Sequence, residues 1–140
     1  MMALPQSLAG VAQYLGKEGV NQLVVKCFYC ADFLTWADKV LYDHAKIDVI
    51  WVDGGFYAAC YSCTKANARV DFMINYEGVA NVDEIELQYG RSIEDLQVRC
   101  TSCLREFNSI EKRDVRTTDP DLFIVRGNIR TLCVVCKVLQ

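Results

Sequence analysis

The sequence predicts an α/β (α+β) fold in which two homologous small domains, each carrying four cysteines, are joined by a helical linker. Three observations lead to this prediction. The chain has 140 residues, which suits one medium domain or two very small ones. Its eight cysteines form four Cys-x-x-Cys pairs, and a shift of 73 positions maps the first four cysteines onto the last four. The same shift relates Gly54 to Gly127, so two homologous modules are the economical explanation.

Two helices are predicted in the first half of the chain. Residues 7–16 have the pattern of a short helix, with Ser7 as its N-cap. Thr35 and Asp38 have the spacing of a capping box, which predicts a second helix that continues through Tyr42.

Matching strand and helix signals occur in both halves. Residues 46–52 are rich in β-branched and apolar side chains, which predicts a strand that ends at the turn formed by residues 53–55. In the second half, residues 122–125 predict the matching strand. Asn108 and Glu111 predict the matching helix start.

The segment between the modules is predicted to be mostly helical. Residues 64–76 indicate a helix that leaves the second cysteine pair. Ser92 and Asp95 predict the capped start of another helix, which runs into Cys100. The acidic residues 82–86 are expected to form a solvated helix face or a loop.

Composition argues against several classes of function, among them general nucleic-acid binding. The formal net charge is −3 and the sequence pI is about 5.1. Binding to a phosphate backbone needs a local excess of Lys and Arg, so a nucleic-acid partner is not expected. With one histidine a Ser–His–Asp set is not expected, so the prediction is that the chain is not an enzyme. No apolar run reaches the roughly 18 residues that span a bilayer, so no membrane partner is expected.

The cysteines are expected to be reduced. The N-terminal segment has no basic region before its apolar residues and no clear cleavage site, so we expect it to stay in a mature intracellular protein. Inside the cell thiols are kept reduced, which favours metal ligation over the alternative, a secreted disulfide scaffold.

Four thiolates from two Cys-x-x-Cys turns predict a tetrahedral zinc site with Zn–S distances of about 2.3 Å. The repeat predicts two zinc ions per chain, one held by Cys27, Cys30, Cys60 and Cys63 and the other by Cys100, Cys103, Cys133 and Cys136. A site filled by four thiolates has no open position for a substrate, so both are expected to be structural, and chelation is expected to unfold the protein. Iron–sulfur clusters and redox-active pairs are the alternatives.

These signals divide the chain into four segments: an N-terminal helical arm at residues 1–22, a first zinc domain at 23–63, a helical linker at 64–91 and a second zinc domain at 92–140. Trp36 and Trp51 are expected in the core. The single histidine, His44, is given no role.

The spacing C-x2-C-x29-C-x2-C occurs twice, separated by 36 residues, together with the local words WVDGGFYAAC, RSIEDLQVRCTSCLREFNSIEK and FIVRGNIRTLC. Spacing and words together resemble the papillomavirus early protein six, the viral E-six oncoprotein. The similarity extends from the N-terminal helix to Cys136. Departures from some relatives, such as the acidic composition, resemble cutaneous or animal-virus members.

The resemblance implies a non-enzymatic viral adaptor whose two zinc domains and linker helix form a groove for an acidic LxxLL helix of a host protein. Relatives bind Mastermind-like coactivators and repress Notch signalling, bind paxillin, or redirect a HECT-type ubiquitin ligase to degrade host proteins. The chain ends in KVLQ rather than a PDZ-binding tail, so no PDZ partner is expected and the Mastermind-like group is favoured. The expected location is the host nucleus and cytoplasm.

Carried over residue by residue, the resemblance places at the groove the arginines Arg99 and Arg126 and the apolar residues Phe28, Tyr29, Ile47, Ile50, Ala59 and Val70. Without it, Ile47, Ile50 and Ala59 have the pattern of core residues. The alternative function of another class is a nucleic-acid-binding transcriptional regulator.

Overall fold

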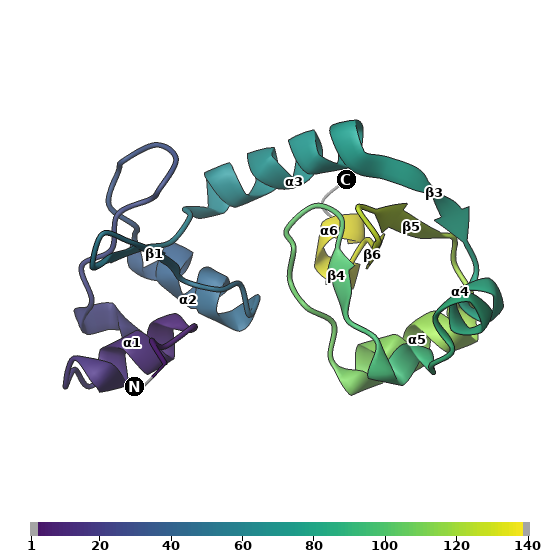
Figure 1. Ribbon diagram of the computed structural model, residues 1–140, viewed down its shortest axis with the longest axis horizontal. Coiled ribbons are helices and arrows are strands. Elements are labelled where there is room, and N and C mark those ends of the chain that lie inside the picture. The colour runs from purple at the N-terminus through teal and green to yellow at the C-terminus, as the bar shows by residue number, and fades with distance from the viewer. Residues whose placement is uncertain (1–2, 139–140) are drawn as a thin grey trace. The chain divides into compact units, whose positions relative to one another are not determined.

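The computed structural model describes residues 3–138, and within them the backbone forms two compact units that meet between residues 66 and 67 (Figure 1). Helix α3, Tyr61–Asn75, begins in the first unit and ends in the second. Residues 1–2 of the predicted arm and residues 139–140 of the tail, on which the PDZ prediction depends, lie outside the described residues.

The first unit contains short elements around one small core. In chain order they are helix α1 (Leu8–Tyr14), the 3₁₀ helix η1 (Val20–Gln22), helix α2 (Trp36–His44), and strands β1 (Ile50–Val52) and β2 (Gly55–Tyr57). The strands pair antiparallel as a hairpin. The predicted caps of both helices are confirmed: Ser7 accepts from the N–H of Gly10, and Thr35 with Asp38 forms a full capping box.

The predicted N-terminal arm is part of the first unit rather than a separate segment. Leu8 and Val11 on α1 are fully buried, and they belong to one core cluster with Leu23, Val25 and Tyr42. Because an amphipathic helix of seven residues is stable only when its apolar face is covered, α1 folds onto the module that follows it.

The strand predicted over residues 46–52 is less than half as long as expected, since only Ile50–Val52 forms it. Lys46 has a φ of 58°, a left-handed conformation that breaks an extended chain, and regular pairing begins only at Ile50. Val49 is buried, and its N–H donates to the carbonyl of Gln6 at 2.7 Å. The apolar pattern of this segment therefore reflects burial in an irregular loop and not a strand. The predicted turn is present, since β1 and β2 join directly at Asp53 and Gly54.

The second unit is built on a four-stranded sheet. Its elements are strand β3 (Tyr76–Ala80), helix α4 (Val82–Tyr89), the 3₁₀ helix η2 (Ile93–Asp95), strand β4 (Val98–Cys100), helix α5 (Ser109–Thr118), strands β5 (Leu122–Val125) and β6 (Asn128–Thr131), and helix α6 (Val134–Val138). The strand order is β3-β5-β6-β4, with β4 parallel to β6 and the other pairs antiparallel. The predicted strand 122–125 and the capping box of Asn108 and Glu111 are confirmed.

The segment 64–91 is more than a helical linker. After α3 ends, β3 pairs with β5 and becomes an edge of the second unit's sheet. In α4, Val82 and Ile85 are buried in the second core, so the acidic stretch 82–86 is an amphipathic helix with one packed face. Strand β3 was missed because its five residues have no alternating polar pattern.

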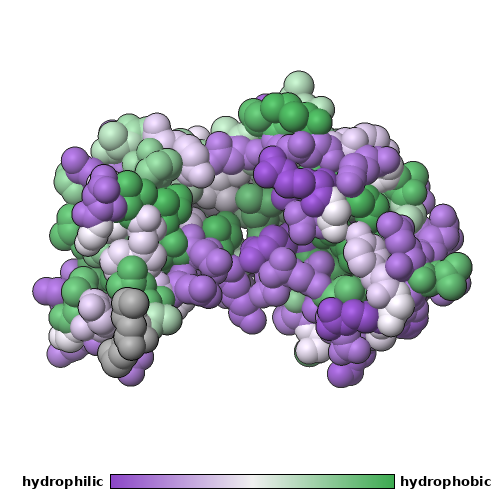
Figure 2. Space-filling view, in the orientation of Figure 1, coloured by the Kyte–Doolittle hydropathy of each residue, from purple (hydrophilic) through white to green (hydrophobic). Residues whose placement is uncertain are grey.

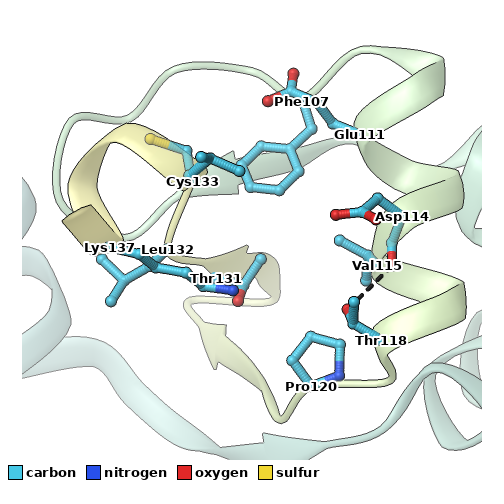
Figure 3. A pocket seen from close by; sticks show the side chains of 11 residues that line it. Phe107, Glu111, Asp114, Val115, Thr118, Pro120, Thr131, Leu132, Cys133 and Lys137 are labelled. Atoms are coloured by element: carbon cyan, nitrogen blue, oxygen red, sulfur yellow. Dashed lines mark hydrogen bonds between the residues drawn. The ribbon is translucent and has the colours of Figure 1, made fainter.

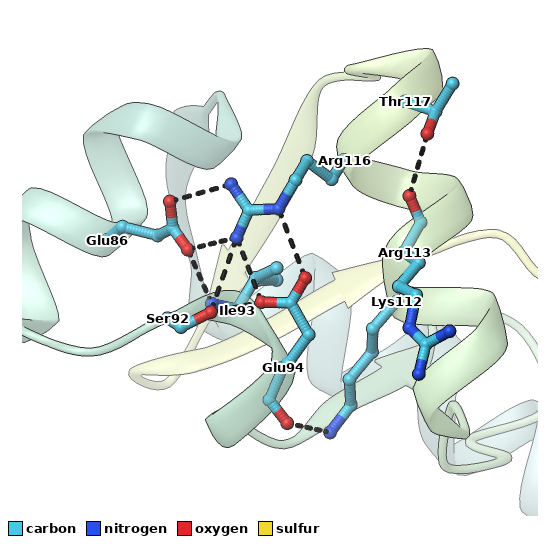
Figure 4. Close-up of polar contacts among 8 residues, drawn as sticks. All are labelled: Glu86, Ser92, Ile93, Glu94, Lys112, Arg113, Arg116 and Thr117. Atoms are coloured by element: carbon cyan, nitrogen blue, oxygen red, sulfur yellow. Dashed lines mark hydrogen bonds and ion pairs between the residues drawn. The ribbon is translucent and has the colours of Figure 1, made fainter.

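The helix predicted from Ser92 into Cys100 does not form. Only the single turn η2 is helical, and it is followed by β4, whose last residue is Cys100. The Ser92 hydroxyl bonds to Glu94 instead of capping a backbone N–H. Figure 4 shows what these residues do: Arg116 of α5 contacts Glu86 of α4 and Glu94 of η2, with Arg116 Nε to Glu94 Oε1 at 3.1 Å.

The two tryptophans differ. Trp51 is partly buried against the first core, and its indole N–H donates to the carbonyl of Pro5 at 2.8 Å. Trp36 is 64% exposed at the start of α2, so its predicted core position is wrong. Over residues 3–138, none of the helices is both long enough and apolar enough to cross a membrane.

Candidate functional site

The structure groups the eight cysteines in the two predicted sets. Within each set the four Sγ atoms all lie within 4.8 Å of one another. Cys30 and Cys60 have their sulfurs 4.0 Å apart, as do Cys103 and Cys133. A tetrahedron with metal–sulfur bonds of about 2.3 Å places its sulfurs roughly 3.8 Å apart, so both clusters have the dimensions of a four-thiolate metal site.

Each cluster begins in a tight knuckle that is repeated across the two halves. The residue after the first Cys-x-x-Cys pair of each module, Ala31 or Leu104, has a left-handed backbone with φ near 65° and 63°. Its N–H donates to the carbonyl of Cys27 or Cys100 at 3.0 Å in both modules. This turn brings the two sulfurs of a pair to one side, which is what a shared ligand requires.

One thiol in each cluster has a pKa below neutrality. In the second cluster the side chain of Cys103 donates to the Cys100 sulfur and, against the effect of burial, lowers the pKa of Cys100 to about 4. In the first cluster burial raises the pKa of Cys27, but backbone N–H groups, including that of Cys60, outweigh it and lower this pKa to about 6. Each cluster therefore presents a thiolate at neutral pH to which a cation can bind.

The chemistry available to such clusters is structural. Four sulfurs fill a tetrahedral coordination shell and leave no position for a water molecule or a substrate. Soft thiolates select zinc or iron–sulfur centres over magnesium and calcium, which prefer oxygen. The residues present fit zinc well, since all ligands are cysteines and each cluster contains one ready thiolate.

A separate pocket of about 430 Å³ lies within the second unit, against α3. Its lining residues are Asn67, Val70, Asp71, Ile74, Asn75, Leu104 and Arg126. Val70 and Ile74 are one helical turn apart and both exposed, so together with Leu104 they give the pocket an aliphatic floor. Polar groups form the rest of the lining. This composition suits an aliphatic side chain carried by a polar backbone.

Three of the predicted peptide residues lie at or beside this pocket. Val70 and Arg126 line it. Arg99 lies one contact away, because its Nη1 donates to the carbonyl of Leu104 at 2.8 Å. Asp71, Ile74 and Leu104 were not singled out in the sequence. Val70 and Ile74, with their i, i+4 spacing, are the one signal that could have indicated a shared face.

The other predicted peptide residues belong to the first unit. Phe28 and Tyr29 are about half exposed, and their rings meet edge to face at 5.4 Å. Ile47 packs partly buried against the first core, and Ala59 is buried within it at 6% exposure. Ile50 is partly buried on β1. For these residues a role in peptide binding stays a prediction.

Surface hydrophobicity alone does not single out a site. Hydrophobic side chains appear among hydrophilic ones on the drawn face of each unit (Figure 2). Scattered apolar residues are normal on protein surfaces, so a concave lining is the stronger criterion. A second cavity, between α5 and the residues before α6, holds only about 40 Å³ around Phe107, Val115 and Cys133 (Figure 3). That volume admits roughly three water molecules and is too small for a drug-sized ligand.

Comparison with known proteins identifies relatives along nearly the whole chain. The profile of a family described as Early Protein (E6) matches residues 27–136, from the first cysteine to the last. Protein E6 of Human papillomavirus 20 is 32% identical over 137 residues, which cover 98% of this chain and 82% of that protein. Protein E6 of Human papillomavirus 14 is 33% identical over 137 residues, covering 98% and 80%. Protein E6 of Human papillomavirus 47 is 32% identical over 136 residues, covering 97% and 86%.

Proposed function

Because this chain belongs to the papillomavirus early protein E6 family, we propose that it is a non-enzymatic viral adaptor that captures acidic LxxLL helices of host proteins. Two zinc ions hold its modules folded. The partners that we propose as favoured are the Mastermind-like coactivators, whose capture represses Notch signalling. Such partners work on transcription, so the proposed location is the host nucleus as well as the cytoplasm.

Zinc is the metal that the cluster chemistry favours. Both clusters consist of thiolates only, and each is built from two Cys-x-x-Cys turns. The modules are small, and a structural zinc ion contributes on the order of 10 kcal/mol to folding in domains of this kind. When bound, zinc supplies no reaction chemistry in a closed shell; it holds the knuckles in place.

The observation that carries the binding proposal is the aliphatic pocket of the second unit. Val70, Ile74 and Leu104 line it, and Arg126 lies at the same pocket. A leucine side chain loses water on entering such a pocket, which contributes about 1.5–3 kcal/mol when burial is complete. A guanidinium beside it can pair with an acidic residue of the incoming helix.

The alternative within the same class is capture of a HECT-type ubiquitin ligase through its own LxxLL motif, which leads to degradation of host proteins. The two partner groups share the leucine pattern, so the pocket supports both. They are separated by direct binding measurements rather than by geometry.

The test is fluorescence anisotropy with the zinc-loaded full chain and labelled LxxLL peptides from Mastermind-like coactivators, paxillin and the ubiquitin ligase. We expect micromolar or tighter binding that is lost when the peptide leucines are replaced by alanine. Ile74→Ala should weaken binding about tenfold. Met73→Ala is the matched control, because Met73 is 75% exposed on the same helix and does not line the pocket.

Two results would contradict the proposal. One is that no peptide binds at micromolar concentration while the protein retains two zinc ions. The other is equal weakening by Ile74→Ala and Met73→Ala, which would place the peptide elsewhere. Circular dichroism and zinc content are measured for both variants, so that loss of folding is not mistaken for loss of a contact.

A further inference from the structure

One carboxylate in the pocket is shared between two arginines. Asp71 Oδ1 accepts from Arg126 Nη2 at 3.0 Å, and Asp71 Oδ2 accepts from Arg130 Nη2 at 2.8 Å. Asn75, one turn further along α3, donates to the same carboxylate at 2.6 Å. The acid is thus held from both sides, by the helix that carries it and by the turn and strand that follow β5.

The two arginines differ in accessibility. Arg126 is 68% exposed at the side chain, whereas Arg130 on β6 is only 8% exposed. The Nε and Nη1 atoms of Arg130 are buried, and neither has a hydrogen-bond partner among residues 3–138. Asp71 therefore supplies the counter-charge for a buried guanidinium, and it must stay ionised to do so. Burial raises the pKa of Asp71, but the contacts of Asn75 and Arg130 outweigh it and lower this pKa.

These contacts fix the local charge. Two guanidinium groups and one carboxylate leave a single positive charge, and that charge is accessible only at Arg126. Without the carboxylate, an incoming peptide would meet two positive charges. Glu77 also lies nearby, since it accepts from the N–H of Gly127 at 3.2 Å, and its negative charge is the same in every variant compared below.

We propose that Asp71 is a specificity-determining residue of this pocket, which limits the preference for acidic helices by sharing its carboxylate between Arg126 and Arg130. The inference rests on the proposed function and deepens it. The partner that it favours is an LxxLL helix whose acidic flank is modest, because only one exposed arginine is left to pair with it. A helix with a strongly acidic flank gains less affinity at this pocket than it would beside two arginines without a neighbouring carboxylate.

The magnitude is set by exposed electrostatics. A pair of partly solvated charges contributes about 0.2–1 kcal/mol, which corresponds to an affinity change of roughly 1.5- to 5-fold. Salt screens such pairs, with a Debye length of about 10 Å at 0.1 M ionic strength. The effect of Asp71 should therefore be largest at low salt, whereas burial of the aliphatic side chain is insensitive to salt.

The test compares two LxxLL peptides that differ only by Glu or Gln at one flanking position. The measured quantity is the ratio of their dissociation constants, which cancels any effect that a substitution has on the aliphatic contact. Asp71→Asn keeps the size of the side chain and removes its charge, so the preference for Glu should rise about threefold in 20 mM salt and shrink in 500 mM salt.

Substitutions at Arg130 keep the inference testable if Asp71→Asn does not fold. Arg130→Met removes the buried charge and leaves Asp71 paired with Arg126, so the preference for Glu should fall below that of the wild type. The double variant Asp71→Asn with Arg130→Met contains no unpaired buried charge and leaves one exposed arginine, so it should behave as the wild type.

The outcomes separate the two proposals. If the wild-type protein binds neither peptide, the proposed function fails. If it binds both, and the Glu-to-Gln ratio is the same in the wild type and in folded Asp71→Asn and Arg130→Met variants, the specificity role of Asp71 fails while the pocket stands. The inference is supported if the preference for Glu is highest in Asp71→Asn, intermediate in the wild type and lowest in Arg130→Met.

Discussion

The two modules share the same turns and strand pairings around their cysteines but differ in how exposed those cysteines are. The left-handed residues Lys46, Asp53 and Gly54 recur 73 positions later as Asp119, Arg126 and Gly127. The parallel bridge between Cys27 and Ala58 recurs between Cys100 and Thr131, where it is part of a sheet. The repeat therefore preserves the turns and pairings around each cluster.

The two modules differ in the exposure of their cysteines, in one ion pair and in one strand. In the first cluster Cys30 is exposed, whereas three of the four cysteines in the second are buried. Arg105, which pairs with Glu111 in the second knuckle, stands where the first has Asp32. The sheet of the second module also contains strand β3, which pairs with β5 and has no counterpart in the first sheet. Local turns thus bring the cysteines of each cluster together, whereas the exposure of the cysteines differs between the two clusters.

The largest test of this comparison removes equivalent ligands. We expect Cys30→Ser and Cys103→Ser each to lose one zinc ion, because a missing thiolate forfeits much of a coupling on the order of 10 kcal/mol. Each unit has its own core, so the amide NMR signals of the other unit should persist. Zinc content and the two-dimensional spectrum are measured together. Retention of two ions, or collapse of both units, would contradict independent modules.

The next test concerns packing elements that the repeat does not contain. Leu8 on α1 and Ile85 on α4 are both fully buried, and replacing either by alanine should destabilise its unit by about 2–5 kcal/mol. Denaturant unfolding at saturating zinc measures the loss. Leu87→Ala is the control, because Leu87 is 86% exposed and its removal should change stability by less than about 0.5 kcal/mol.

A smaller and symmetric effect is expected at the helix caps. Thr35 and Asn108 each accept from the N–H three residues later, at 3.1 and 2.9 Å. Thr35→Ala and Asn108→Ala should each cost about 1 kcal/mol of the free energy of unfolding, measured by thermal or denaturant melts. A much larger loss in one module would show that its capping residue contributes more than local hydrogen bonds.

The smallest effect is the pH dependence of the charge cluster in the second module. Hydrogen bonds from Arg116 and Ser92 lower the pKa of Glu94 to about 2. Because this pKa is lower in the folded protein than the ordinary value of 4.5, ionised Glu94 stabilises the fold at pH values above about 4.5. That stabilisation is lost as the pH falls towards 2. Arg116→Gln should therefore lower the melting temperature at pH 7 by more than at pH 3. An equal loss at both pH values would mean that ionisation of Glu94 does not contribute to stability.

Local signals predicted much of the fold. The knuckles, the two predicted capping boxes and the grouping of cysteines follow from short-range patterns in the sequence. The strand at 46–52 was overestimated because burial, not pairing, explains Val49, and the left-handed Lys46 gives no sequence signal. Strand β3 pairs with residues of β5 that lie 42 to 49 positions further along the chain, which periodicity cannot reveal.

The candidate pocket was predictable only in part. The resemblance to a family indicated Val70 and Arg126, because such knowledge carries long-range information. Asp71 could not be found, since its partners lie 55 and 59 residues further along the chain. Its role depends on the burial of Arg130, and an arginine in an ordinary strand gives no sign of being buried.

Helix α3 also has a thermodynamic consequence. Cys63 lies in its first turn and Cys60 directly precedes it, while Val70 and Ile74 in its later turns line the pocket. Helix formation is cooperative, so ions that fix the first turn also favour helix in the turns that follow. On the proposed function, peptide affinity and zinc affinity of the first cluster are therefore expected to be linked, and each ligand should raise the affinity for the other by the same factor.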